Sequence, residues 1–404
     1  MVEQSVQQNA LRRSLSQTQM VLYGLGTTVG AGIYALIGEI AGIAGHWAPW
    51  SFLLAAALAA FTALSFAELS ARYPKAAGAA LYVQNGFDSE RLALVVGILV
   101  IVAGTVSSAA LLNGFVGYLQ EFIALPRTAV ILMAALLLGL IALWGIAESV
   151  WIAGLISVIE VAGLIWITSL SATAIEFGQV NVNLLIPDFS LHSFSLIAGG
   201  AVLAFYAYIG FEDMVEVAEE VRDVTRTLPR AILLTLGLSS LIYVVLVTST
   251  ILATGPELLA GSSAPLADVY RSLTGNDPIT ISLIGLFAII NGALIQIIMA
   301  SRVLYGLASR GQIPQWFARV NGRTRTPVLA TITAASTTLL LALSGSLALL
   351  AEMTAVTMLC IFALVNLALY RLTRKQARIR AFLAMTGAVV CTAFALRSAV
   401  LWII

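Results

Sequence analysis

The sequence predicts an all-α polytopic membrane protein that crosses the bilayer about eleven times. Of its 404 residues, 60% are hydrophobic and 10% are charged, whereas a soluble domain carries about 25% charged residues. Eleven segments are apolar over the roughly 20 residues that a membrane-spanning helix needs. These segments are longer and more uniformly apolar than the strands of a membrane barrel, and in lipid a helix satisfies its own backbone hydrogen bonds.

The eleven segments, called spans here, follow one another with mostly short connections. No hydrophilic stretch is long enough for a soluble domain, so residues 1–404 are expected to form a single transmembrane domain. The longest connections on the outer side are residues 173–193 and 254–278. The spans are expected at residues 17–44, 48–70, 92–119, 126–144, 149–172, 194–221, 230–253, 279–305, 328–343, 347–370 and 381–403.

The positive charges predict the orientation. With the N-terminus in the cytoplasm, eighteen of the 21 Lys and Arg residues fall on the inner side. Only Arg127, Arg271 and Arg397 fall on the outer side. Cytoplasmic connections of membrane proteins carry an excess of Lys and Arg, so a multi-pass protein of the cytoplasmic membrane is expected. The connection near residues 145–148 has no positive charge, so the fourth and fifth spans are the least supported part of the count of eleven.

Several function classes are disfavoured by composition. The net charge is +1, which offers no positive excess for a nucleic acid. Two Cys and two His make a metal site improbable, and no cofactor is expected. The sequence shows no pair of a nucleophile and a base that would indicate an enzyme. The glycines from Gly24 to Gly30 follow no strand, so they do not form a dinucleotide-binding fingerprint.

Two spans carry features that interrupt a helix. In span one, Gly30 and Gly32 bracket a single alanine at mid-membrane depth, and glycine permits backbone geometry that other residues avoid. Close packing of two helices through small residues is the alternative interpretation. In span six the apolar run turns polar at Gly210, and six carboxylates follow within residues 212–223. Alternatively, the span simply ends at Gly210.

The two interruptions fall at matching places, since spans one and six each begin a set of five. Broken helices at corresponding positions of two halves are the best sequence indication of a transporter binding site. The N-terminus of a half-helix favours a carboxylate, and free carbonyl groups suit an ammonium group. A zwitterion fits such a site at both ends.

Four motifs resemble the amino acid–polyamine–organocation family of permeases. They are Gly30–Tyr34, Ala67–Pro74, Phe205–Glu212 followed by Glu219–Glu220 and Leu228–Ile232, and Ser301–Tyr305 with Gly311 and Pro314. The resemblance implies a core of two inverted five-helix repeats with broken helices 1 and 6. Repeat one would cover about 15–172, repeat two about 194–370, and an extra helix about 381–403. Many family members have one helix more.

The resemblance also implies a substrate site. The substrate carboxylate would meet backbone N–H groups around Val29, Gly30, Ala31, Gly32 and Ile33. The amine would meet carbonyls at the second interruption, which runs through Phe205, Tyr206, Tyr208, Ile209 and Gly210. Ordinary packing is the alternative role for each aromatic ring.

Four charged residues are candidates for proton coupling or gating. Glu160 stands alone midway along span five, and a carboxylate inside a membrane is a functional candidate by default. Some proton-coupled relatives look to carry a lysine there, so the mechanism does not transfer unchanged. Glu212 matches an acidic family position. Glu68 and Arg72 are four residues apart on one helix and should form a pair at an inner gate. The alternative for Glu160 is a structural role with a hydrogen bond to span one or eight. For Glu212 it is a solvated wall of the inner vestibule, and for Glu68 and Arg72 it is a pair of surface charges at the membrane face.

Together these features predict secondary active transport of an amino acid by alternating access. Proton-coupled symport of a neutral amino acid is favoured, with the substrate, the proton and the lipid bilayer as partners. Span eight offers Asn291 and Gln296 but no hydroxyl at mid-span, which disfavours sodium. A cationic amino acid or polyamine transporter or exchanger is the alternative. A non-transporting amino-acid sensor is the alternative from another class.

Overall fold

A computed structural model describes residues 13–75, 78–144, 150–175, 182–188, 190–324 and 326–403. This described part is almost entirely helical, and its one β-type contact is an isolated bridge between Leu15 and Val221. Within the described residues, nine stretches are long and apolar enough to cross a membrane. The first stretch, Gln17–Arg72, contains both of the first two spans, and Val328–Ser344 is a shorter apolar helix. Each of the eleven predicted spans is therefore represented, while residues 145–149 lie outside the described part.

The long helices agree with the predicted spans to within a few residues at most ends. They are α2 (Gln17–Val29), α3 (Ala31–Ala44), α4 (Ala48–Arg72), α6 (Glu90–Gln120), α7 (Arg127–Trp144), α8 (Val150–Ala174), α9 (Leu191–Tyr208), α10 (Val224–Thr254), α13 (Ile279–Ser309), α14 (Val328–Ser344), α15 (Leu347–Thr373) and α16 (Arg378–Ile403).

Short helices lie between them. These are α5 (Gly78–Phe87), α11 (Pro256–Leu259) and α12 (Pro265–Thr274), with the 3₁₀ helices η1 (Gly45–Trp47), η2 (Val182–Leu185), η3 (Phe211–Glu220) and η4 (Gln315–Ala318).

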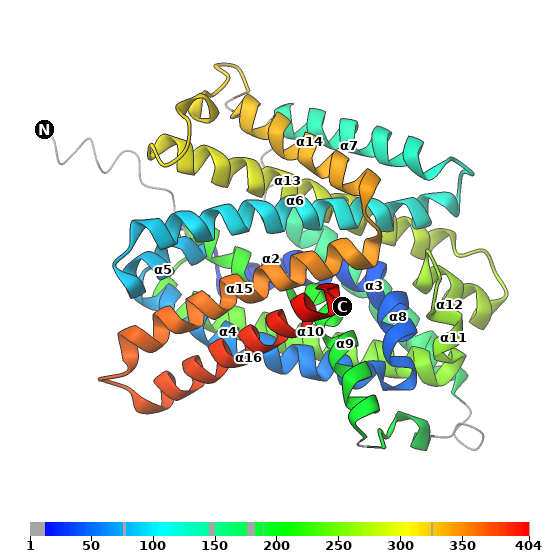
Figure 1. The fold of residues 1–404 in the computed structure, drawn as a ribbon. Helices are drawn as coiled ribbons and strands as arrows, with labels where there is room; N and C mark the ends of the chain where they lie inside the picture. The colour runs from blue at the N-terminus through cyan, green and yellow to red at the C-terminus, as the bar shows by residue number, and fades with distance from the viewer. Residues whose placement is uncertain are drawn as a thin grey trace, which may run out of the picture.

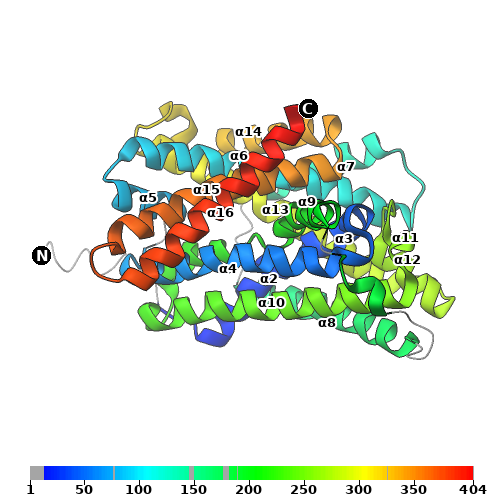
Figure 2. The ribbon, with the colours of Figure 1, turned by 60° about the horizontal axis from the view of Figure 1, so that its bottom comes forward.

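The long helices form one bundle with two distinct ends (Figure 1). One end, which we call the basic end, carries α5, the turn between α15 and α16, and the connection after α13. The opposite end, the loop end, is covered by α11 and α12. Turned by 60°, the bundle has α8 and α10 along one side and α6, α7 and α14 along the other (Figure 2). Large side chains such as Leu140 and Phe287 are exposed on the outer helices, as expected where lipid surrounds the protein.

Both predicted interruptions are present. α2 ends at Val29 and α3 begins at Ala31, because Gly30 has φ −57° and ψ −113°, which lies outside the helical region. α9 ends at Tyr208, and Gly210 has φ +128°. The ten residues that follow, Phe211–Glu220, form a 3₁₀ helix. Runs of 3₁₀ helix longer than 3–4 residues are uncommon, so the second half of span six is not a regular α-helix.

The two interruptions pack directly against each other. A Cβ atom at Gly210 would overlap the main-chain carbonyl of Thr27. The Thr27 hydroxyl donates a hydrogen bond of 2.9 Å to the carbonyl oxygen of Gly210. Glycine at position 210 is therefore required both by its positive φ and by the close approach of the chain.

We expect Gly210→Ala to lower the free energy of unfolding by at least about 1–3 kcal/mol, because the positive φ and the overlap with Thr27 both oppose a side chain. Thermal unfolding of the purified protein measures this. Gly237→Ala is the matched control, since Gly237 is exposed on α10 and a Cβ there meets nothing within 4 Å. That helical substitution should stabilise slightly. Equal thermal stability of the two variants would contradict the proposed packing.

Candidate functional site

A cavity of about 500 Å³ lies between the two interruptions, and we call it the central cavity. It is enclosed by α2, α3, α6, α13 and the region around the second interruption. Its lining residues are Gly26, Thr27, Thr28, Ala31, Gly32, Ser107, Leu111, Tyr206, Ile209, Asp213, Ala288, Gly292, Ile295 and Gln296.

Four of the ten predicted substrate-binding residues line the central cavity: Ala31, Gly32, Tyr206 and Ile209. The other six are Val29, Gly30, Ile33, Phe205, Tyr208 and Gly210. All six are buried, and none of them lines this cavity.

The two aromatic residues in that second group have well-defined packing partners. The ring of Phe205 packs edge-on against Phe362, with centroids 5.7 Å apart. The Tyr208 hydroxyl donates to the carbonyl of Phe52 at 3.3 Å, and its ring lies 5.2 Å from that of Tyr243. These contacts are the ones that the packing alternative expects.

The first turn of α3 has a free positive end. No side chain caps its N-terminus at Gly30, so the main-chain N–H groups of its first turn carry the positive end of the helix dipole. Ala31 and Gly32, in that turn, line the central cavity. A carboxylate in the cavity would be stabilised at this helix end.

Gly32 also brings two helices together. A Cβ atom there would lie only 2.8 Å from the Cα of Ala207 on α9. Gly32 therefore serves close packing whether or not it meets a substrate. Loss of function in a bulky variant such as Gly32→Leu would not separate these two roles.

Tyr243 of α10 joins the two interruptions, and sequence reasoning missed it. Its hydroxyl lies 2.8 Å from the carbonyl oxygen of Thr28 and 2.9 Å from that of Ala207, and shares its proton between them. Both carbonyls precede an interruption and have lost regular helical partners. In the sequence Tyr243 is a lone aromatic residue in the apolar run of span seven, which gives no signal of this role.

Glu160 of α8 lies against the first interruption. Its carboxylate oxygen Oε2 would be 3.2 Å from a Cβ atom built at Gly30, and the residue is only 2% exposed. The main-chain carbonyl of Glu160 accepts a hydrogen bond of 2.8 Å from the Tyr34 hydroxyl of α3. The carboxylate therefore faces protein, not lipid, and its role in coupling stays a prediction.

A second cavity of about 580 Å³ adjoins the central cavity, and we call it the acidic cavity. The two cavities share Ser107, Ile209, Asp213 and Gln296. Its position toward the basic end follows from Gly78 and Ala79 of α5, which line it. The remaining lining residues are Phe66, Val100, Ala103, Glu212, Glu216, Met299, Val303, Thr354, Met358, Ile361 and Phe362.

Three carboxylates, Glu212, Asp213 and Glu216, line the acidic cavity, and none of the described residues around either cavity is basic. Glu216 is exposed to solvent and the other two are partly exposed. The Glu212 carboxylate accepts the N–H of Gly210 at 2.9 Å, so it also supports the second interruption. Sequence reasoning selected Glu212 but not Asp213, which is the carboxylate that reaches both cavities.

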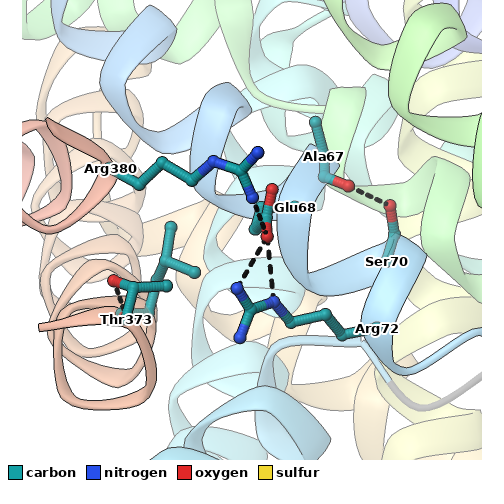
Figure 3. Close-up of polar contacts among 7 residues, drawn as sticks. Ala67, Glu68, Ser70, Arg72, Thr373 and Arg380 are labelled. Atoms are coloured by element: carbon teal, nitrogen blue, oxygen red, sulfur yellow. Dashed lines mark hydrogen bonds and ion pairs between the residues drawn. The ribbon is translucent and has the colours of Figure 1, made fainter. Parts of the chain in front are cut away.

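The predicted pair of Glu68 and Arg72 is present at the basic end (Figure 3). Arg72 Nε and Nη2 lie 2.9 and 2.8 Å from Glu68 Oε1. Arg380 of α16 donates to the same oxygen at 2.7 Å, a contact across 312 residues that helix spacing cannot predict. Neither Glu68 nor Arg72 is among the described residues that line the central or the acidic cavity. The observed effect of the cluster is to fasten α16 to α4.

The loop end is closed over the site. A Cβ atom at Gly38 of α3 would lie 2.6 Å from the carbonyl oxygen of Leu259, so α11 packs tightly on α3. Arg271 of α12 forms ion pairs with Glu121, just past the end of α6, and with Asp268. The described loop end is thus closely packed, whereas Glu216, which lines the acidic cavity, is exposed to solvent.

Comparison with known proteins gives consistent results. Residues 15–404 match the family model described as amino acid permease. An uncharacterized transporter of Mycobacterium tuberculosis is 29% identical over 391 residues, which cover 95% of this chain and 86% of the relative. Cationic amino acid transporter 3, mitochondrial, of Arabidopsis thaliana is 28% identical over 89% of this chain and 62% of the relative. Cationic amino acid transporter 4 of Homo sapiens is 28% identical over 85% and 57%.

We expect Tyr243→Phe to destabilise the protein by about 1–3 kcal/mol, because two buried carbonyls lose their donor, and to slow uptake. Tyr82→Phe is the control: Tyr82 is also fully buried, and its hydroxyl has no hydrogen-bond partner among the described residues. Thermal unfolding and initial uptake rates compare the two. If both variants behave alike, Tyr243 does not hold the interruptions together.

Proposed function

Because the chain belongs to the amino acid permease family, we propose that it carries an amino acid across the membrane by alternating access through the central cavity. The observation that carries this proposal is the uncapped N-terminus of α3, which opens on the central cavity beside the second interruption. The closed loop end and the solvent-exposed acidic cavity correspond to a state open toward the basic end. We place that end in the cytoplasm, following the distribution of Lys and Arg.

In this proposal each end of the substrate has its own partner. The α-carboxylate binds N–H groups of the first turn of α3, at Ala31 and Gly32, which line the central cavity. The ammonium group lies toward the second interruption, near Tyr206 and Asp213. The Tyr206 hydroxyl forms a hydrogen bond of 2.8 Å with the Oγ of Ser107. This bond holds the Tyr206 side chain in place at the wall of the cavity.

The carboxylates favour a cationic side chain over the neutral one that the sequence suggested. A substrate seated between the interruptions can extend its side chain past Asp213 into the acidic cavity, where Glu212 and Glu216 follow. Burying a cation requires a counter-charge, and these residues supply it without a competing basic side chain. Two of the relatives described above are named cationic amino acid transporters, which supports the same preference. Apolar walls such as Phe66 and Phe362 support the neutral alternative.

For coupling, we assign the proton to Glu160. Its carboxylate lies against Gly30, so a change in its charge alters the electrostatic field at the first interruption. Binding and release of a proton there link the ion to the element that holds the substrate carboxylate. Transport involves no covalent step, and we assign no enzymatic activity.

Glu160→Gln should abolish the pH dependence of net uptake in proteoliposomes while sparing counterflow, which needs no net proton movement. A glutamate with only a structural role behaves differently, since glutamine keeps its shape and most of its hydrogen bonds. Uptake with the wild-type pH profile would defeat the coupling assignment. Absence of counterflow in the wild-type protein with every amino acid tried would instead favour the sensor.

Asp213→Asn should raise the KM for lysine or arginine by roughly 10–100-fold, equivalent to about 1.5–3 kcal/mol for an interaction with a charged group. Uptake of alanine or leucine should change little. Glu220→Gln makes the same charge change on the same 3₁₀ helix, at a residue that lines neither cavity. This control should change neither the KM for lysine or arginine nor the uptake of alanine or leucine. A wild-type protein that carries only neutral amino acids would establish the neutral alternative.

A further inference from the structure

The turn between α15 and α16 concentrates positive charge at the basic end. Residues 371–380 include five basic residues and no acidic one. All five side chains are exposed. They are Arg371, Arg374, Lys375, Arg378 and Arg380. Most other basic residues at the basic end are spread along longer stretches of the sequence, so positive charge is denser in this turn than elsewhere at that end.

Two of these charges are fixed by neighbours and three are not. The Arg371 guanidinium lies 4.7 Å above the ring of Phe87 on α5, and Arg380 pairs with Glu68 (Figure 3). Arg374, Lys375 and Arg378 have no ion-pair partner among the described residues. Because Glu68 already serves two arginines, the surroundings retain an excess of positive charge.

Exposed apolar side chains stand next to the free charges. Ile379 is 78% exposed and Phe382 is 70% exposed. Phe382 is four residues after Arg378 on α16, so the two lie on the same face of the helix. A basic side chain beside an exposed aromatic ring, at the end of a membrane-spanning helix, is the arrangement expected at a lipid headgroup and the upper part of its acyl chains.

We propose that Arg374, Lys375 and Arg378 bind the phosphate headgroup of an anionic phospholipid in the adjoining leaflet, with its acyl chains along Ile379 and Phe382. Clusters of basic residues next to a spanning helix attract anionic lipid, each residue contributing about 1 kcal/mol, or about fivefold in affinity. The headgroup would lie beside Arg380 and Glu68, the contacts that fasten α16 to α4. The proposal does not depend on the transported substrate.

The test compares binding of phosphatidylglycerol and phosphatidylcholine to the purified, delipidated full-length protein by native mass spectrometry. The wild-type protein should retain phosphatidylglycerol in excess, and the variant R374Q/K375Q/R378Q should lose this preference by about tenfold or more. The control R310Q/R319Q/R323Q removes the same amount of charge from exposed residues at the same end. This control should keep the preference for phosphatidylglycerol. Thermal unfolding of each protein, with and without phosphatidylglycerol, shows that the variants are folded and gives a second measure of binding.

Equal loss in both triple variants would overturn the proposal and indicate diffuse attraction to the surface charge. No preference for phosphatidylglycerol in the wild-type protein would overturn it as well. Inorganic phosphate that protects the wild-type protein against unfolding as well as phosphatidylglycerol does would point to a free anion instead of a lipid. A loss of the lipid-induced stabilisation that is confined to R374Q/K375Q/R378Q would support the proposal independently of the mass spectra.

Discussion

The contact between the two helix interruptions is the constraint on which the rest of the site depends. Inside a membrane every backbone polar group needs a partner within the protein, and an interruption removes several at once. Here Tyr243 supports both interruptions, and the second is supported in addition by Thr27 of the first and by Glu212. Tyr243 serves the carbonyls of Thr28 and Ala207, the Thr27 hydroxyl serves the carbonyl of Gly210, and Glu212 accepts the N–H of that glycine. The first turn of α3 has no side-chain cap, which leaves it available to a substrate.

The same constraint explains what could be predicted from the sequence. Spans are predictable because lipid demands long apolar helices and because positive charge marks one side. The interruptions were predictable because Gly30 and Gly210 permit geometry that other residues avoid. The pair Glu68–Arg72 follows from helical spacing. Each of these inferences uses only neighbours in the chain.

The parts of the site that the sequence could not separate or did not reveal depend on which way a helix faces. Phe205 and Tyr208 stand beside Tyr206 in one short motif, yet only Tyr206 lines the central cavity, because the two others point toward α15 and α4. Ser107, Tyr243 and Arg380 come from distant helices whose rotation and depth are set by packing in three dimensions. Asp213 and Glu212 are adjacent, and only the structure shows that Asp213 joins the two cavities.

The substrate class and the coupling ion are not independent in such a site. Glu212, Asp213 and Glu216 share one cavity wall without a basic partner among the described lining residues, and close carboxylates cannot all stay charged without a cation. Either protons or the side chain of the substrate must neutralise them. A cationic substrate would therefore displace protons from these groups and resemble an exchange, while a neutral substrate would leave them protonated. Glu160 lies apart, at the first interruption against Gly30, so a proton held there would be free of this competition. Protons on Glu212, Asp213 and Glu216 would thus be exchanged for a cationic substrate, whereas a proton on Glu160 could move together with that substrate.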